Sequence, residues 1–405
     1  MVIRLRNFLL ALTLLCFTLP VVAQDSPPDP FKTARMRFGP LALTPTVSVT
    51  DVGIDNNVFN EWENPKRDFT ATVTPGTAFF LRLGRGRLTG NATLGYVFFE
   101  QYASQRGVNG GASVRAELPL IHVRPYLAFS YLNARERPGY EIDARVRHFD
   151  RTVTAGVALP LTAGTTIDVS GHTTGISYAS DSVFLGTSLR DAFDGDLQGA
   201  AASLQHKLTP LTTVILAADA ERARYRFSPI RDSETVRVTA GLDFSPFALV
   251  TGSARVGFRR LEMLSPGMPD YRGLVASADL GYTLHGVTHF SVGINRDIFN
   301  SIDVQQPYYL QTGLTLTATQ HVAGPWDVQA RWNGQRLDYR RVMTAGNTTP
   351  SGRTDRVTFF GGGMGYRLGH TARLGLNLDA YRRRSPLTTR EYTGLKVGSS
   401  LTYGL

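Results

Sequence analysis

The chain has 405 residues and a formal net charge of +10, and it is 42% hydrophobic but only 19% charged. Soluble domains carry about 25% charged residues, so this chain is poor in charge. The single Cys excludes a disulfide framework and any multi-cysteine metal centre, and the aromatic content of 10% argues against disorder. Beyond the N-terminus, no apolar run approaches the roughly 20 residues of a spanning helix. A large β-structure remains, either soluble or in a membrane.

The first 23 residues predict a secretory signal peptide. Arg4 and Arg6 give it a positive start, residues 8–19 form an apolar stretch, and Ala23 supplies a small residue for cleavage. The polar, proline-rich segment that follows predicts an extended periplasmic leader over residues 24–40. The remainder, residues 41–405, is expected to form a single barrel.

From Leu41 onward the chain repeats one pattern, in which apolar and polar or small side chains alternate over 10 to 14 residues. In one such stretch, Val236 and Val238 flank Arg237. A period of two places alternate side chains on opposite faces of a β-strand. No stretch sustains the 3.6-residue period of a helix. The sequence therefore predicts an all-β protein.

The connections between these stretches alternate between short and long. Eight tight turns and nine longer polar loops make 17 connections and hence 18 strands, with 16 as the alternative count. Short turns on one side and longer loops on the other are typical of outer-membrane β-barrels. Closing the sheet into a barrel also gives every backbone N–H and C=O group in the lipid a hydrogen-bond partner. A transmembrane antiparallel barrel in the outer membrane is the prediction, and a packed soluble β core is the alternative.

The final stretch predicts the C-terminal strand that the barrel-insertion machinery recognises. Leu401, Tyr403 and Leu405 lie on one face, with an aromatic residue near the end. The usual last residue is Phe or Trp, so the match is partial. The insertion machinery is accordingly an expected partner.

If the apolar residues face lipid, the interleaved residues face the lumen, and many of these are basic. The lumen set contains Arg115, Arg124, Arg237, Arg255, Arg259, Arg331, Arg367, Arg373 and Lys396, together with Gln311 and Gln329, and with Asp243, Asp279 and Asp379 as a minority. An excess of arginine would concentrate anions in the passage. The alternative is that these arginines pair with lumen carboxylates and only stiffen the wall.

Motifs for catalysis and metal binding are missing from the sequence. There is no H-E-x-x-H, G-x-S-x-G or P-loop pattern, and the eight His residues are dispersed. Ser170 and His172 form the nearest local pair, but neighbours two apart in a strand are common by chance. We expect no enzymatic activity, no metal and no cofactor.

The net positive charge of the chain favours lipid phosphates over nucleic acid as a partner. An exported protein meets little nucleic acid, and no recognition motif accompanies the charge. Residues 340–341 and 382–384 are basic clusters on the loop side of their strands, where lipopolysaccharide phosphates would lie. Outer-membrane lipid and lipopolysaccharide are therefore expected partners.

The first part of the barrel resembles the beta-barrel porin type 2 family. The resemblance rests on Asp55-Asn56-Asn57-Val58-Phe59, then Asp68-Phe69 and Val73-Thr74-Pro75-Gly76, followed by hairpins to the C-terminus. It implies an outer-membrane barrel of a kind often linked with exopolysaccharide production and export, with export components in the periplasm as separate partners. The residues themselves indicate that Asp55 to Asn57 form a turn closed by their own side chains.

Three functions follow from this pattern. The leading one is a passive conduit for a polar, anionic solute or an exopolysaccharide. A general porin for small solutes is the first alternative. The second is a non-conducting barrel that has a structural or surface-binding role.

Overall fold

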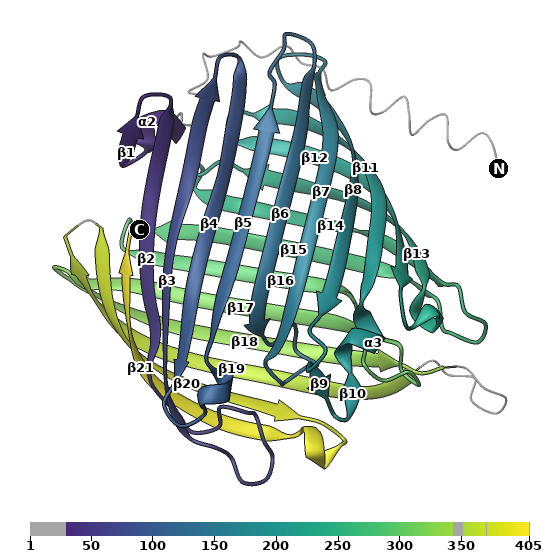
Figure 1. The fold of residues 1–405 in the computed structure, drawn as a ribbon. Helices are drawn as coiled ribbons and strands as arrows, with labels where there is room; N and C mark the ends of the chain where they lie inside the picture. The colour runs from purple at the N-terminus through teal and green to yellow at the C-terminus, as the bar shows by residue number, and fades with distance from the viewer. Residues whose placement is uncertain (1–29, 343–350, 370, 405) are drawn as a thin grey trace.

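A computed structural model describes residues 30–342, 351–369 and 371–404, and within them 18 long strands form a closed antiparallel barrel (Figure 1). Each strand pairs with its neighbours in the sequence, and the first barrel strand closes the sheet against the last. The predicted fold and its 18 strands are confirmed. The predicted signal peptide (residues 1–23) and Leu405 lie outside the described residues.

The strands have these bounds. The first seven are β2 (Leu41–Asp55), β3 (Asp68–Leu83), β4 (Gly86–Phe99), β5 (Gly107–Glu117), β6 (Arg124–Glu136), β7 (Val146–Pro160) and β8 (Thr165–Tyr178). The next six are β11 (Gly195–Thr209), β12 (Thr212–Tyr225), β13 (Ser233–Phe244), β14 (Val250–Met263), β15 (Tyr271–Leu284) and β16 (Thr288–Asn300). The last five are β17 (Tyr308–Ala323), β18 (Trp326–Arg340), β19 (Ser351–Leu368), β20 (Ala372–Arg384) and β21 (Tyr392–Tyr403).

The segment before β2 has local structure of its own. It contains the short helix α2 (Pro30–Thr33) and the strand β1 (Met36–Phe38), which pairs with the start of β2. Of the leader predicted over residues 24–40, residues 24–29 lie outside the described part. The rest is not a featureless extended chain, because β1 adds to the edge of β2.

Alternation along the strands separates two environments. Val236 and Val238 on β13 are more than half exposed on the outer face, as are Leu376 and Leu378 on β20. Arg237, between the two valines, faces Asp219 of the neighbouring strand. An apolar exterior and a polar interior are the arrangement of a barrel in lipid. No helix in the described part of the chain is long and apolar enough to cross a membrane.

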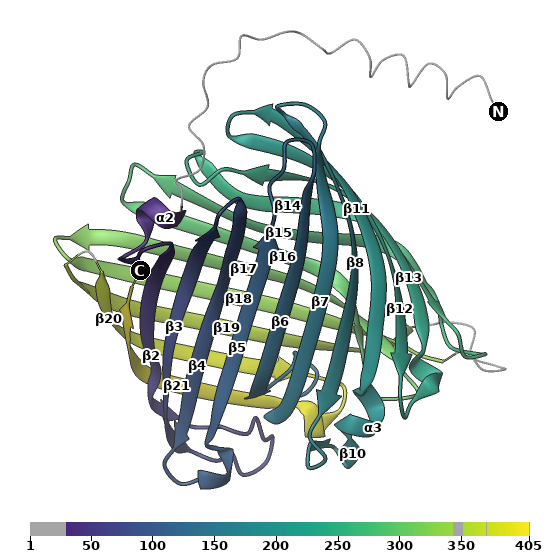
Figure 2. The same ribbon diagram turned by 45° about the horizontal axis from the view of Figure 1, so that its top comes forward.

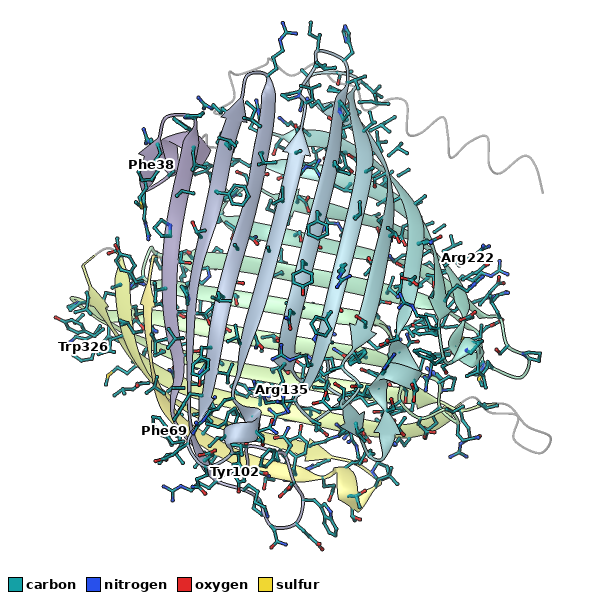
Figure 3. The ribbon with its side chains drawn as sticks, viewed as in Figure 1. Phe38, Phe69, Tyr102, Arg135, Arg222 and Trp326 are labelled. Carbon is teal, nitrogen blue, oxygen red and sulfur yellow. The ribbon has the colours of Figure 1, made fainter. Side chains whose placement is uncertain are left out.

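The two ends of the barrel differ. The short turns lie at the end that also holds α2 and the C-terminus, whereas the long loops lie at the other end, with β9 (Val183–Phe184), β10 (Thr187–Ser188) and α3 (Leu189–Phe193) (Figures 1 and 2). Three short 3-10 helices, Ala103–Gln105, Pro229–Arg231 and Thr388–Arg390, also lie in the loops. Aromatic residues mark the short-turn end, where Trp326 packs edge-on against Tyr366 at 4.9 Å (Figure 3).

The turn that was predicted after β2 is present. The Asn57 amide donates a hydrogen bond of 2.9 Å to Asp55 Oδ1. The Asn57 side chain, which is 1% exposed, donates to the carbonyls of Glu61 and Thr393. This motif therefore fastens the first loop to β21.

Candidate functional site

The loop between β6 and β7, residues 137–145 (here called L3), folds into the barrel. Glu141, Ile142 and Asp143 in L3 are all less than 10% exposed. Their partners lie on β19, β20 and the loop between β20 and β21. Five strands separate β20 from β6 by the shorter way round the barrel, namely β21, β2, β3, β4 and β5. L3 therefore reaches across the lumen.

Arg383 on β20 is the centre of the contact with L3. It is fully buried and donates hydrogen bonds to the Tyr140 carbonyl (2.8 Å), to Asp143 Oδ2 (3.0 Å) and to Asp355 Oδ2 (2.5 Å). Arg390 also bonds Asp143, at 3.2 Å, and donates to a carbonyl of L3. Two guanidinium groups thus hold one carboxylate of L3, an arrangement that a dry site tolerates because the charges are paired.

Glu141 anchors the loop at a second point. Ser301 Oγ donates to its carboxylate at 2.7 Å and the Ile302 amide donates at 3.0 Å. Arg353 lies 3.7 Å away. Burial raises the pKa of Glu141, and the hydrogen bonds and the nearby arginines oppose this shift only in part.

Apolar side chains complete the contact between the loops. Ile142 packs in a cluster with Phe184 and Phe193 from residues 179–194 (L4) and with Ile302 from residues 301–307 (L7). A loop end filled by side chains in this way leaves a narrowed passage instead of an open pore.

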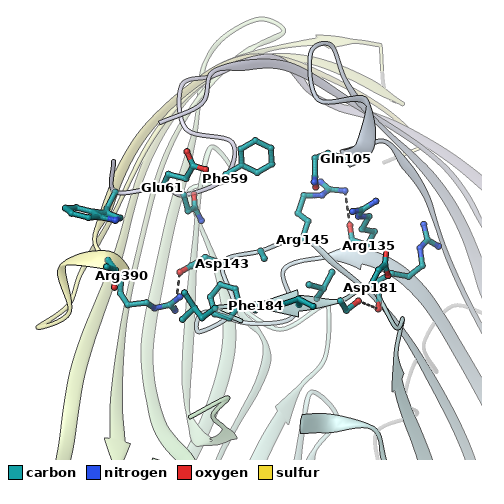
Figure 4. Close-up of a pocket in the computed structure, with 18 of the residues that line it drawn as sticks. Phe59, Glu61, Gln105, Arg135, Asp143, Arg145, Asp181, Phe184 and Arg390 are labelled. Carbon is teal, nitrogen blue, oxygen red and sulfur yellow. Dashed lines mark hydrogen bonds and ion pairs between the residues drawn. The ribbon is translucent and has the colours of Figure 1, made fainter. Parts of the chain in front are cut away.

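L3 separates two cavities. The outer one has a volume of about 600 Å³ and is lined by L3, L4 and residues 59–63 of the first long loop (Figure 4). The inner one, of about 220 Å³, lies on the lumen side and has a largely aromatic lining that includes Tyr178, Tyr225 and Tyr309. Asp143 lines the outer cavity and Glu141 lines the inner one.

Arg145 lies at the floor of the outer cavity, which we call the vestibule. Its guanidinium donates to the Arg135 carbonyl at 2.8 Å and lies 5.1 Å from the ring centre of Phe99. Among the described residues, no carboxylate is within ion-pairing distance of Arg145. Burial, followed by the charges of Arg137 and Arg135, lowers its pKa to about 10. Its positive charge is therefore not neutralised locally.

The vestibule also carries carboxylates, but at different places. Glu63 and Asp181 line it from exposed positions, Glu61 is partly buried, and Asp143 is already bonded to Arg383 and Arg390. In Figure 4, Arg145 and Arg135 lie on one side of the cavity, opposite Arg390 and Asp143. The vestibule thus carries charges of both signs, with Arg145 and Arg135 on the side away from Asp143.

Most of the arginines that were predicted on the barrel wall are paired with carboxylates. Arg237 bonds Asp219 at 2.8 Å and lies 3.5 Å from Asp297, which also bonds Arg259 at 2.8 Å. On the same two strands, β13 and β14, Arg255 bonds Asp243, also at 2.8 Å. The alternative raised by the sequence, an arginine wall neutralised by carboxylates, describes this region.

A second group of wall arginines lies flat across β19. Arg331 reaches Asp379 at 2.7 Å and Arg373 reaches Asp327 at 2.5 Å, in each case between β18 and β20. This is possible because β19 presents Gly361 between the first pair, where a Cβ would lie 2.5 Å from Asp379 Oδ1. The glycine run thus leaves room for ion pairs.

The other predicted basic residues are more varied. Arg115 stacks on Tyr126, with its guanidinium carbon 3.5 Å from the ring centre, and Arg367 lies 3.6 Å from Asp327. Lys396 contacts Asp51 at 2.5 Å. Arg124 is exposed at the start of β6.

Sequence reasoning missed residues of two kinds. The wall carboxylates Asp219, Asp297 and Asp327 were not assigned to the lumen, although they follow the same alternation. Arg137 and Arg145 were also missed. Their signal was the repeated R-x-R spacing on either side of L3, Arg135-Glu136-Arg137 and Arg145-Val146-Arg147.

The described residues offer no group of three or more His, Cys, Asp or Glu side chains that could hold a metal ion. His172 contacts Glu221 at 3.3 Å, but its neighbour Ser170 forms no triad with them. The charged side chains at the loop end are suited to binding and orienting charged solutes.

Comparison with known proteins places the chain among porins. None of the curated proteins matches it. Solved structures that resemble it include a BenF-like porin from Pseudomonas fluorescens Pf-5, with 12% identity, a TM-score of 0.50 and coverage of 90% of this chain and 99% of that one. Two others, from Pseudomonas aeruginosa, are OccK1 (OpdK), with 11% identity, a TM-score of 0.49 and coverage of 90% and 98%, and OccK2 (OpdF), with 12% identity, a TM-score of 0.49 and coverage of 90% and 98%. The likeness to the BenF-like porin supports the barrel fold.

The model of one protein family matches almost the whole described barrel, over residues 29–404. This agrees with the resemblance seen in the sequence, and it extends that resemblance from the first strands to the last. The chain belongs to the family described as Putative beta-barrel porin 2.

Proposed function

We propose that this outer-membrane barrel is a selective passive channel for small, negatively charged organic solutes. In this proposal the loop-filled mouth sets the selectivity and the barrel wall contributes little. The observation that carries it is Arg145, a half-buried guanidinium on the vestibule floor without a carboxylate partner among the described residues.

The charge distribution supports selection at the mouth. Wall arginines such as Arg237 and Arg331 are paired with aspartates, so they add little net field to the lumen. Arg145 instead feels the like charges of Arg135 and Arg137, which outweigh the opposite charges of Glu136 and Asp51. A carboxylate or phosphate group that enters the vestibule would relieve this repulsion and form two-point contacts with a guanidinium.

The size of the passage supports a small solute over an exopolysaccharide chain. L3 crosses the lumen, and the cavities on its two sides hold about 600 and 220 Å³. A polymer could pass only if L3 and L4 left the barrel. Deletion of the gene followed by an assay of secreted polysaccharide tests the export function: unchanged secretion supports the small-solute channel.

Ion selectivity in planar bilayers tests the proposal directly. Under a KCl gradient, we expect the channel to prefer chloride to potassium. One unit charge about 6 Å from the ion path stabilises chloride and destabilises potassium by about 0.7 kcal/mol each in water, so Arg145→Gln should lower the permeability ratio about tenfold.

Arg222→Gln is the matched control for this measurement. Arg222 also lies towards the loop end, but it points away from the barrel and pairs with Glu234 (Figure 3). Its substitution should leave the ratio unchanged. A wild-type channel that prefers cations, or an Arg145→Gln variant with wild-type selectivity, contradicts the proposal.

A further inference from the structure

The outer surface of the barrel carries a row of arginines where three strands end together. The pairing places Arg336 of β18 directly opposite Arg356 of β19, and Arg356 directly opposite Arg384 of β20. Side chains that face each other in this way have Cβ atoms about 5 Å apart. All three arginines are exposed. Like charges directly opposite each other are destabilising unless an anion lies between them.

The row faces outward because it continues the apolar outer face of its strands. On β20, Leu376 and Leu378 are more than half exposed. Alternate residues continue this face through Ala380 to Arg382 and Arg384. On β19, Phe360 is 58% exposed and shares its face with Arg356. The row therefore lies where the apolar belt ends, on the side of the long loops.

The charge of this row is largely uncompensated. Arg382, which shares the outer face of β20 with Arg384, is counted with the row from here on. Arg336 bonds Asp338 at 2.9 Å, and this is the only ion pair that the described residues supply to these four arginines. The outward arginines of another flank are different, because Arg222 and Arg224 share Glu234, at 2.9 and 3.4 Å. Carboxylates of the protein thus neutralise Arg222 and Arg224, but they leave most of the charge of the row without a partner.

We propose that Arg336, Arg356, Arg382 and Arg384 form a binding site for the phosphate groups of lipopolysaccharide in the outer leaflet. Strands lie about 4.8 Å apart, so the row spans roughly 10 Å and one phosphate can contact two guanidinium groups. The acyl chains of the same lipid then cover the apolar side chains directly below. This inference concerns the outer surface and is independent of the selectivity of the mouth.

The structure also refines the prediction made from residues 382–384. The sequence presents three consecutive arginines as one cluster, but the strand divides them. Arg382 and Arg384 are exposed on the outer face, whereas Arg383 is buried and holds L3. The lipid site is therefore built across three strands and not along one.

The test compares two double variants of the full barrel in detergent. Arg356→Gln with Arg384→Gln removes two charges from the row, and Arg222→Gln with Arg224→Gln removes two charges from the control flank. Slower migration after heating in a denaturing gel shows that each barrel has folded. The melting temperature is then measured with bisphosphorylated lipid A, with dephosphorylated lipid A, and with inorganic phosphate at the same phosphate concentration.

We expect bisphosphorylated lipid A to raise the melting temperature of the wild type and of the control variant. The row variant should bind it at least tenfold more weakly, because a hydrogen bond to a charged group is worth about a factor of ten. The single variant Arg384→Gln should show an intermediate loss, and it replaces the double variant if that one fails to fold. Equal responses of the row variant and the wild type overturn the proposal. So does an equal response of the wild type to dephosphorylated lipid A or to inorganic phosphate.

Discussion

The most informative perturbation of the mouth is Arg383→Met. The substitution removes the hydrogen bonds to Tyr140, Asp143 and Asp355 and leaves two buried carboxylates without their shared cation. Breaking a buried ion pair in this way costs about 3–5 kcal/mol. Arg353 and Arg390 remain near the two carboxylates, so the lower end of that range is expected. Most of the loss should fall on the attachment of L3, because the strand ladders of the barrel are unchanged.

A loss of about 3 kcal/mol shifts the balance between closed and open L3 by more than a hundredfold. Single-channel conductance should therefore rise, and backbone amides in residues 137–145 should exchange their hydrogens faster. Arg222→Met is the control, since Arg222 is exposed on the outer face and pairs with Glu234 instead of L3. If Arg383→Met has the conductance and the exchange rates of the wild type, L3 is not held by this cluster and the reasoning is refuted.

Three more predictions concern the mouth, the wall and the sheet. Burial raises the pKa of Glu141, so the closed position of L3 binds a proton more tightly than the open position and is favoured at low pH. Conductance in bilayer recordings should therefore fall as the pH drops through that raised pKa, and Glu141→Gln should abolish this pH dependence. Asp297→Asn leaves Arg237 with one aspartate and Arg259 with none, so the permeability ratio of chloride to potassium should rise; a fall would show that the wall pairs do not neutralise each other. Gly252→Ala should destabilise the barrel by about 1–3 kcal/mol, because its φ of 104° disfavours a side chain and the new Cβ would clash with the Asp279 carbonyl; an unchanged melting temperature would contradict this.

The barrel was predictable because each of its strands lies between lipid and water. Residues such as Val236, Arg237 and Val238 must then alternate, and the alternation is visible without any partner. The number of strands followed from the turns for the same local reason. Long loops break the pattern at every second connection, so the count of 18 needed no tertiary information.

The path of L3 could not be predicted in this way. Glu141 and Asp143 look like ordinary polar loop residues, and what draws them inward is a set of partners more than 150 residues away. The net charge of the lumen could not be decided from the sequence for a related reason. The charge of Arg237 is neutralised only if the strand pairing and the curvature of the sheet bring aspartates beside it. The alternation along a single strand does not show which aspartates these are.

The attachment of L3 also has a consequence for biogenesis. L3 joins β6 and β7, the fifth and sixth strands of the barrel, but its partners Arg383 and Arg390 come from the last hairpin. During assembly, therefore, L3 cannot complete its attachment until that hairpin has docked and the sheet has closed. An incompletely assembled barrel would be leaky, and the passage would reach its final width only in the last step.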